Sequence, residues 1–421
     1  MLTDNPNLER GKLLYEQHRY EQALIAFQQA IADNPDQYEP LLYQAYTLMQ
    51  LDRYSEALGL ADRLLHSEPD DPYILHLKAQ ILNHLKREDE ALTLIEEAIS
   101  QSPGEDAFWA TASTLHFDRK DFDKALDAAN EGLRLNPGNT ICLNLRTLSL
   151  TKLHRTDEIA SSIEETLAED PGDAFSHASS GWALLESGNH QQARVHFAEA
   201  LRISPGMSWA EQGMLQAIKA KNPLYRFFMR YYFWMANLKG GNQWLFIIGT
   251  FLALRWIDNI ENPTIVVQVA QFTLVVFLWL SWFIDPLFNV LMLTDRDGRH
   301  LLNDRQRDRY RYVAGMLGLG VPMALVGYFG QPLNQLWLAN MFLTGLMLIG
   351  LVLPLSAWIE VSEGKNRQRM RWVFGGMAVT AVLSALLLPF TGLGVSLFSL
   401  FTIELLGFMI LRNYLLIQHN D

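Results

Sequence analysis

The stretch DDPYILHLKAQILNHLKREDEALTLIEEAISQSP, residues 70–103, is one period of a pattern that fills the first half of the chain. The proline that closes this stretch recurs every 34 residues, without insertion or deletion. Its six copies are Pro35, Pro69, Pro103, Pro137, Pro171 and Pro205. Because proline cannot continue a helix, each copy predicts the end of one helical unit and the start of the next.

Small residues recur within the same period. When the units are counted from Asp4, the eighth position holds Gly11, Ala45, Ala79, Ser113, Thr147 and Gly181. The twentieth position is alanine in all copies except the fifth, which has Ile159. Small side chains let two helices lie close together, so each unit predicts a pair of packed helices.

This pattern resembles the tetratricopeptide repeat, a 34-residue helix–turn–helix unit with small, aromatic and proline residues at these offsets. The resemblance implies an all-α fold in which residues 4–207 form six repeats, stacked as a right-handed solenoid with a concave inner surface. A solenoid needs a cover for its last apolar face, and we expect residues 208–221 to form this capping helix.

Charge divides the chain into two halves. Residues 1–221 have 19 Lys and Arg against 35 Asp and Glu, a formal charge of −16, whereas residues 222–421 have a formal charge of +4. The acidic half argues against a nucleic-acid partner, because phosphate binding needs clustered Lys and Arg. The single cysteine, Cys142, excludes an intrachain disulfide and is typical of a reducing compartment. The first residues, MLTDNPNLERGK, have no apolar core of the kind that a secretory signal needs.

The second half begins with aromatic residues mixed with basic ones, NPLYRFFMRYYFWMANLKGGN, residues 222–242. This mixture favours an interfacial segment in contact with membrane lipid at the headgroup level. A buried helix packed on the end of the solenoid is the alternative. The runs NPLYRFFMRYYFWM and DPLFNVLML also resemble segments that follow tetratricopeptide arrays in uncharacterised bacterial membrane proteins. That resemblance implies a shared architecture and no activity.

Long apolar stretches in residues 243–416 predict a six-helix transmembrane bundle, followed by a tail at 417–421. The six expected spans are residues 243–260, 265–284, 312–329, 336–359, 372–389 and 394–416. Connections rich in Lys and Arg alternate with connections that have none. By the positive-inside rule, the repeats, both basic loops and the C-terminus should be cytoplasmic, at a bacterial plasma membrane. Asp285 is expected to cap a short amphipathic helix, PLFNVLMLT, that lies along the membrane.

No pattern of catalytic residues stands out. The chain has no P-loop, no dinucleotide-binding glycine motif, no G-x-S-x-G elbow and no H-E-x-x-H. His76 and His84 lie two turns apart, but no third ligand accompanies them, so we expect no metal site. We therefore expect no enzyme activity and no cofactor. The glycines of VAGMLGLGVP in the third span are interpreted as sites of close helix–helix packing.

The repeat surface is the first candidate site. In tetratricopeptide proteins the first helix of each pair lines the concave surface, and the resemblance implies a peptide-binding groove of aromatic and amide side chains there. Its expected lining is Tyr43, Tyr46, Met49, Tyr73, His76, Gln80, Asn83, Thr111, Thr114, Phe117, Asn144 and Trp182. The paired Lys and Asn that clamp acidic tails in some relatives are not found. For Tyr43 and Trp182, a place in the solenoid core is an equal alternative.

The second candidate site is Glu404, near the middle of the sixth span. A carboxyl group at that depth is costly, which makes it a functional candidate. Arg255 in the first span is the basic residue at comparable depth, so an Arg255–Glu404 pair is one interpretation. A protonated Glu404 without an ionic partner and a proton or ion relay are the others.

Three functions remain open from the sequence. The first is a membrane-anchored adaptor whose cytoplasmic groove binds a protein segment and recruits a complex to the membrane. The second is a transporter or channel that the repeat domain regulates. The third is a membrane-bound enzyme, which would need a cluster of acidic, His or Cys residues at one interface.

Overall fold

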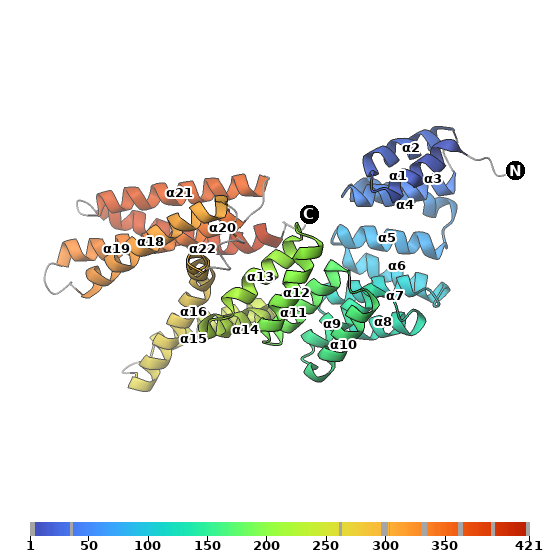
Figure 1. The fold of residues 1–421 in the computed structure, drawn as a ribbon. Coiled ribbons are helices and arrows are strands. Elements are labelled where there is room, and N and C mark those ends of the chain that lie inside the picture. The colour runs from blue at the N-terminus through green and yellow to red at the C-terminus, as the bar shows by residue number, and fades with distance from the viewer. Residues whose placement is uncertain are drawn as a thin grey trace. The chain divides into compact units, whose positions relative to one another are not determined.

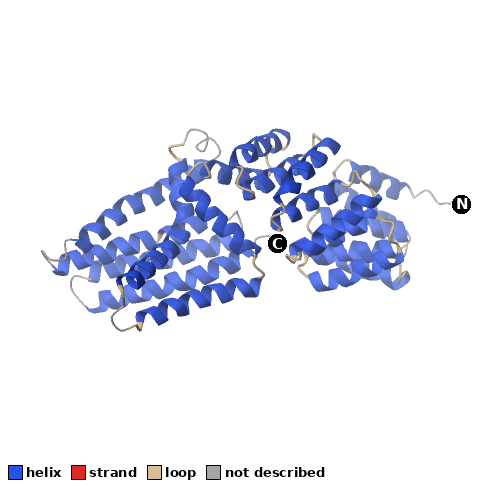
Figure 2. Ribbon diagram, turned by 90° about the horizontal axis from the view of Figure 1, so that it is seen from below, coloured by secondary structure: helices blue, strands red, loops and turns tan. Residues whose placement is uncertain are grey.

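The computed structural model describes residues 5–33, 37–260, 263–295, 302, 304–329, 335–360, 365–388 and 392–417, and every regular element in these ranges is an α-helix (Figures 1 and 2). The chain divides into two compact units. The array comprises Met1–Gly213 together with Ala236–Gly240, and the apolar unit comprises Met214–Met235 together with Gly241–Asp421. Pro35, residues 296–301 and 303 of the connection between the second and third predicted spans, and residues 418–421 of the predicted tail lie outside the described residues.

The array contains six consecutive helix pairs. Their helices are α1 (Pro6–Glu16), α2 (Tyr20–Asp33), α3 (Tyr38–Gln50), α4 (Tyr54–Ser67), α5 (Pro72–His84), α6 (Glu88–Gln101), α7 (Asp106–Asp118), α8 (Phe122–Leu135), α9 (Thr140–Lys152), α10 (Thr156–Glu169), α11 (Ala174–Glu186) and α12 (His190–Ile203). The odd-numbered helix of each pair is called the first helix below. The expected solenoid of helix pairs is thus confirmed.

Every pair turns through one residue in the left-handed backbone conformation. These residues stand 34 apart: His18, Asp52, Lys86, Lys120, His154 and Gly188, with φ between 56° and 93°. The conformation ends the first helix, since it lets the following amide bond back to the helix, as Arg87 N does to Leu82 O at 2.9 Å. Five of the six residues are not glycine, so the turn is set by the repeat as a whole.

Within a pair, glycine and phenylalanine are matched in size. A Cβ atom added to Gly11 would lie 2.4 Å from the Phe27 ring, and one added to Gly181 would lie 2.7 Å from the Phe197 ring. Only glycine leaves room for a ring at this place. The small residue at the eighth position of the repeat is therefore a packing requirement in these two copies.

The fifth pair departs from the pattern by having a polar interior. Thr147, Ser162 and Thr166 are buried between α9 and α10. The hydroxyls of Thr147 and Ser162 are 2.7 Å apart, and Thr166 Oγ1 donates to the Ser162 carbonyl at 2.7 Å. These hydrogen bonds offset the cost of burying three hydroxyl groups at positions where most of the other pairs have glycine, alanine or leucine.

The remaining helices are α13 (Ser208–Lys219), α14 (Pro223–Asn237), α15 (Gly240–Asp258), α16 (Ile265–Met292), α18 (Asp304–Phe329), α19 (Gln335–Gly350), α20 (Val352–Glu360), α21 (Lys365–Leu387) and α22 (Gly392–Ile417). The first part of α13 packs on the last repeat helix, because a Cβ atom at Gly213 would lie 2.2 Å from the Phe197 ring. In α14, the predicted interfacial segment, Tyr225, Phe228 and Met229 are buried. Phe228 stacks on Phe277 of α16 at 5.4 Å.

The prediction of six spans is wrong. Within the described residues, four helices are long and apolar enough to cross a membrane: Ile265–Met292, Gln306–Phe329, Trp337–Ile359 and Arg367–Leu387. The first predicted span forms α15, but Arg255 and Asp258 near its end shorten its apolar stretch. The sixth forms α22, in which the described side chains make an apolar stretch at Leu393–Phe408, and it is not among these four.

The prediction of a separate amphipathic helix after Asp285 is also wrong. Helix α16 continues through Pro286 to Met292, and Pro286 and Phe288 are buried. Asp285 caps nothing there and accepts hydrogen bonds from Lys219 Nζ at 3.1 Å and Tyr225 Oη at 2.6 Å. Proline is tolerated within this helix where neighbouring side chains surround it.

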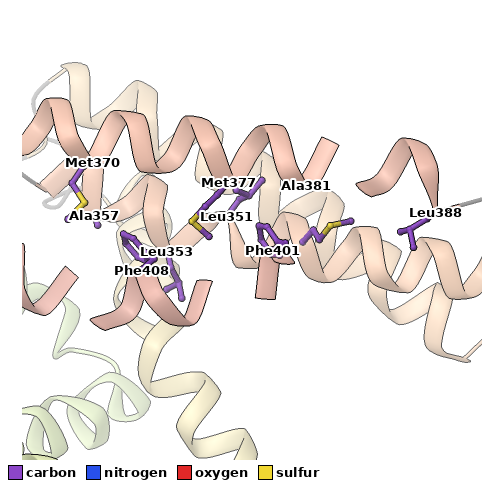
Figure 3. Close-up of a cluster of buried hydrophobic side chains, with 10 residues drawn as sticks. Leu351, Leu353, Ala357, Met370, Met377, Ala381, Leu388, Phe401 and Phe408 are labelled. Atoms are coloured by element: carbon purple, nitrogen blue, oxygen red, sulfur yellow. The ribbon is translucent and has the colours of Figure 1, made fainter. Parts of the chain in front are cut away.

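The core of the apolar unit lies between α19–α20, α21 and α22, where ten apolar side chains are buried together (Figure 3). Helices α18 and α19 approach at glycines: a Cβ atom at Gly345 would lie 2.6 Å from the Gly320 carbonyl oxygen. The predicted role of glycine in helix packing therefore holds for Gly320. Around Gly315 and Gly318, by contrast, a Cβ atom would meet nothing within 4 Å.

Candidate peptide-binding surface

The predicted groove residues all lie on first helices. Tyr43, Tyr46 and Met49 are on α3, Tyr73, His76, Gln80 and Asn83 on α5, Thr111, Thr114 and Phe117 on α7, Asn144 on α9, and Trp182 on α11. The structure thus brings them to equivalent helices of successive repeats. Their exposure, however, differs widely.

Several of these side chains join one first helix to the next. His76 Nε2 lies 2.8 Å from Thr111 Oγ1, and burial lowers the pKa of His76 to about 4, so its imidazole is neutral. Asn144 is buried and donates to Ser176 Oγ at 2.9 Å. These contacts stabilise the stacking of the repeats and leave little of either side chain for a ligand.

Two predicted residues have rings that pack between helices. Tyr43 stacks on Phe27 with 5.6 Å between ring centroids. Trp182 meets the Phe197 ring edge-on at 5.6 Å, and its Nε1 donates to the Trp209 carbonyl at 3.3 Å. Of the two interpretations of these rings, the structure favours the solenoid core.

Four large apolar side chains of the first helices are more than a third exposed, and three of them, Tyr73, Ile141 and Phe175, occupy a single repeat position at the start of the helix; the fourth is Leu13 of α1. We call the side chains at that position the apolar row: Tyr73, Ala107, Ile141 and Phe175, with Trp209 at the same place in α13. Tyr73 is 47% exposed, Ile141 54% and Phe175 47%, and the Phe175 and Trp209 rings stack at 5.2 Å. Sequence reasoning found only Tyr73. The 34-residue spacing of the other four was the signal that could have found them.

Carboxylates border the apolar row, because each helix begins just before it. Asp71 and Asp173 cap α5 and α11, where their side chains accept hydrogen bonds from backbone amides. Glu105, before α7, accepts from Tyr73 Oη at 2.8 Å. This surface therefore presents apolar side chains flanked by negative charge.

A second feature of the array is a short segment that returns to it from far along the chain. We call Ala236–Gly240, which runs from the last two residues of α14 to the first residue of α15, the strap. Lys120 Nζ donates to the carbonyls of Ala236 and, at 2.7 Å, Leu238. Lys239 pairs with Asp121 at 2.5 Å. Desolvation lowers the pKa of Lys120, so its ammonium depends on these carbonyl contacts. No local sequence pattern signals this contact.

The strap is also held at the end of α11. Asn237 Nδ2 donates to Glu186 Oε1 at 3.1 Å, and the other oxygen of Glu186 pairs with Lys152 at 2.6 Å. The strap is therefore bound by side chains from the fourth and sixth repeats.

The structure does not bring Arg255 and Glu404 together. Thr380 Oγ1 donates to Glu404 Oε1 at 3.1 Å, and Glu404 Oε2 is buried without a hydrogen-bond partner among the described residues. Arg255 is exposed on α15, and no ion pair joins it to Glu404 in the part of the chain that the structure describes. The described residues also contain no group of three His, Cys, Asp or Glu able to hold a metal ion.

Comparison with known proteins supports the repeats. Residues 14–81 and 72–105 match family models described as tetratricopeptide repeat. Among solved structures, the chain is similar to YrrB, a TPR protein with an unusual peptide-binding site (20% identity over 44% of this chain and 95% of that one, TM-score 0.34). It is also similar to TTC0263, a thermophilic TPR protein from Thermus thermophilus (21% identity over 43% of this chain and 99% of that one, TM-score 0.41). A tetratricopeptide repeat protein from Parabacteroides merdae is a third such structure (16% identity over 52% of this chain and 87% of that one, TM-score 0.45).

None of the curated proteins matches the chain. The resemblance of its second half to bacterial membrane proteins therefore stays a prediction from the sequence.

Proposed function

We propose that the chain is a membrane-anchored adaptor, in which the array binds a segment of another protein and the apolar unit holds the array at a membrane. Tetratricopeptide repeats generally serve as scaffolds for protein interaction. The proposal assigns no catalysis, cofactor or metal to the chain, and its partner is a protein rather than a nucleic acid.

The apolar row is the observation that supports this proposal most. Solenoids bury their apolar faces between neighbouring repeats, whereas Tyr73, Ile141 and Phe175 stay about half exposed although Tyr73 and Phe175 also contact the next unit. Large rings and aliphatic side chains dominate the energetics of protein interfaces. The flanking carboxylates narrow the partner to a segment that carries basic as well as apolar residues.

The anchor rests on the four apolar helices and on α15. Phe251, Leu252 and Trp256 of α15 are exposed to an extent that suits hydrocarbon better than water. The alternation of Lys- and Arg-rich connections supports a cytoplasmic array. The bacterial inner membrane is the location that we propose.

Site-specific photo-crosslinking in cells tests the adaptor. A crosslinking side chain at Ala107, Ile141 or Phe175 should capture the same protein, because these positions share one surface. Matched controls are Ile25 on α2 and Val195 on α12, which are as exposed, at 56% and 67%, but lie on second helices. The proposal would be contradicted if the control positions captured the protein as readily as the apolar row does. It would also be contradicted if none of the positions captured a protein.

The captured partner then allows a quantitative test. Replacing Ile141 and Phe175 together with Ala removes two apolar anchors, each of which contributes roughly 2 kcal/mol in typical interfaces. Binding of the purified partner to the full chain should fall about a hundredfold. The paired Ile25→Ala and Val195→Ala variant should bind as the wild type does.

A transporter or channel regulated by the array is the second candidate. The observation that favours it is the half-buried carboxyl group of Glu404 in α22, of which one oxygen accepts a hydrogen bond from Thr380 and the other is buried without a partner among the described residues. Proteoliposomes separate the two proposals. Ion or solute flux that Glu404→Gln abolishes, together with no crosslink from the apolar row, would favour the transporter.

A further inference from the structure

Three arginines and a tryptophan line a hollow of about 390 Å³ in the apolar unit. Arg309 comes from α18, Trp358 from α20, and Arg367 and Arg371 from α21, with Gln368 between the last two. The segment that supplies the α21 side chains, KNRQRMRW at residues 365–372, contains four basic residues and no acidic one. The hollow is therefore a basic site built from three helices.

The geometry of the hollow is set by Trp358. Its ring stacks on Phe374 at 5.9 Å on one side, and the Arg309 guanidinium lies over it at 4.9 Å. The neighbouring Arg307 and Arg311 each pair with the aspartate three residues earlier, at 3.2 Å and 2.8 Å. Arg309 has Gln306 at that place, and its side chain is directed to the tryptophan.

The hollow lies at the same end of three candidate spans. Arg309 is near the start of Gln306–Phe329, Trp358 is one residue from the end of Trp337–Ile359, and Arg367 begins Arg367–Leu387. Arginine and tryptophan at span ends are typical of the headgroup level of a bilayer. The amino-terminal end of α21 adds the positive end of a helix dipole.

We propose that this hollow binds a phosphate group, through the forked guanidinium groups of Arg309, Arg367 and Arg371. Guanidinium matches phosphate oxygens in pairs, and basic pockets between membrane helices suit anionic headgroups. The phosphate belongs either to an anionic lipid or to a soluble ion. The lipid source rests on the membrane anchoring proposed above, whereas the soluble source does not.

Calorimetry on the full chain in a neutral detergent tests the site. The titrants are dihexanoyl phosphatidic acid, dihexanoyl phosphatidylcholine of equal chain length, and inorganic phosphate. We expect saturable binding of phosphatidic acid, at least about tenfold tighter than phosphatidylcholine. Binding of inorganic phosphate with the same arginine dependence assigns the site to phosphate itself, and binding of the anionic lipid alone assigns it to a headgroup.

Arginine variants test whether phosphatidic acid binding depends on the side chains that line the hollow or only on the positive charge of this region. Arg309→Gln with Arg371→Gln should weaken phosphatidic acid binding at least about tenfold, since each basic group contributes about a fivefold factor. Arg311→Gln removes an equal charge two residues from Arg309, outside the hollow, and should change nothing. Because Arg309 also supports Trp358, Arg371→Gln alone provides a variant whose side chain is exposed and free of that packing role.

Two results would overturn the proposal: equal affinity for phosphatidic acid and phosphatidylcholine without phosphate binding, or equal loss in Arg311→Gln and Arg371→Gln. Anchoring is measured separately by washing membranes with alkaline carbonate. A chain that resists the wash but shows either result disproves the phosphate site alone. A chain that the wash releases disproves anchoring, and the inorganic phosphate titration still decides the site.

Discussion

Lys219 at the end of α13 forms an ion pair with Asp285 of α16, with Nζ 3.1 Å from Oδ1. The lysine side chain is buried, and the hydroxyl of Tyr225 donates to the same carboxylate oxygen at 2.6 Å. Burial, followed by the nearby charge of Asp285, raises the pKa of Tyr225 well above its usual value, so the phenol stays a donor. Three helices, α13, α14 and α16, thus meet at one carboxylate.

Asp285→Asn is expected to destabilise the apolar unit by about 3 kcal/mol, because it leaves the buried Lys219 ammonium without its counter-charge. Lys219→Met combined with Asp285→Asn should recover much of that loss, since neither charge is then buried alone. Thermal unfolding of the full chain in detergent measures both. Equal melting temperatures for the single and double variants would mean that the pair contributes no coupling.

The neutral His76 predicts a loss of stability in acid. Its pKa is about 4 in the folded chain and about 6.5 when unfolded, so the unfolded state binds the extra proton between these values. The stability that the neutral form contributes is complete above about pH 6.5, and up to about 3 kcal/mol is lost as the pH falls to about 4.

Denaturant unfolding of the full chain at pH 4.5 and pH 7 checks this expectation. The difference in the free energy of unfolding between pH 7 and pH 4.5 should be smaller in His76→Gln than in the wild type. The exposed His66 on α4 provides the control, and His66→Gln should keep the wild-type difference. A difference that His76→Gln leaves intact would show that other groups cause the acid sensitivity.

Gly181→Ala should destabilise the array by about 1–3 kcal/mol, because the new methyl group overlaps the Phe197 ring. Phe197→Leu in the same chain should restore part of the loss by making room. Gly206→Ala is the matched control, since a Cβ atom there meets nothing within 4 Å, and its effect should stay within about 0.5 kcal/mol. Equal melting temperatures for Gly181→Ala and Gly206→Ala would contradict this packing argument.

In the proposed orientation, helix α15 decides on which side of the membrane the array lies. The basic connections follow the first and the third of the four candidate spans, so a cytoplasmic array requires α15, which is not among those four, to cross as well. Cysteine at Asn259 should then react with a membrane-impermeant thiol reagent in intact bacterial cells. Cysteines at Gly241 and Gly298 should react only after permeabilisation.

The native thiol gives little background in this experiment. Cys142 is buried, and burial raises its pKa to about 12, so it forms almost no reactive thiolate. The unsubstituted chain is the control. Labelling at Gly241 in intact cells would place the array outside and reverse the proposed orientation.

The sequence predicted the helix pairs because their signals are local and periodic. The proline, the small residues and the 34-residue interval each mark the same unit, and six copies reinforce one another. The span count failed where periodicity gives no help: in α15, Arg255 and Asp258 compete with an apolar stretch of marginal length.

The candidate site was predicted less well, for a physical reason. A first-helix position identifies which side chains face the neighbouring repeat, but not whether they bond to it, as His76 and Asn144 do. Contacts between distant segments leave no periodic trace. Lys120 and Leu238 are 118 residues apart, and neither residue type suggests the other.

The strap makes the array a discontinuous domain. A fragment cut at residue 221, the natural choice from the repeat pattern alone, would remove Ala236–Gly240 and leave the Lys120 ammonium and the Glu186 carboxylate without those partners. The six repeats therefore cannot be excised or transferred by a cut after the last repeat without loss of these contacts. Exchange with another repeat protein must carry α14 and the strap along with the repeats.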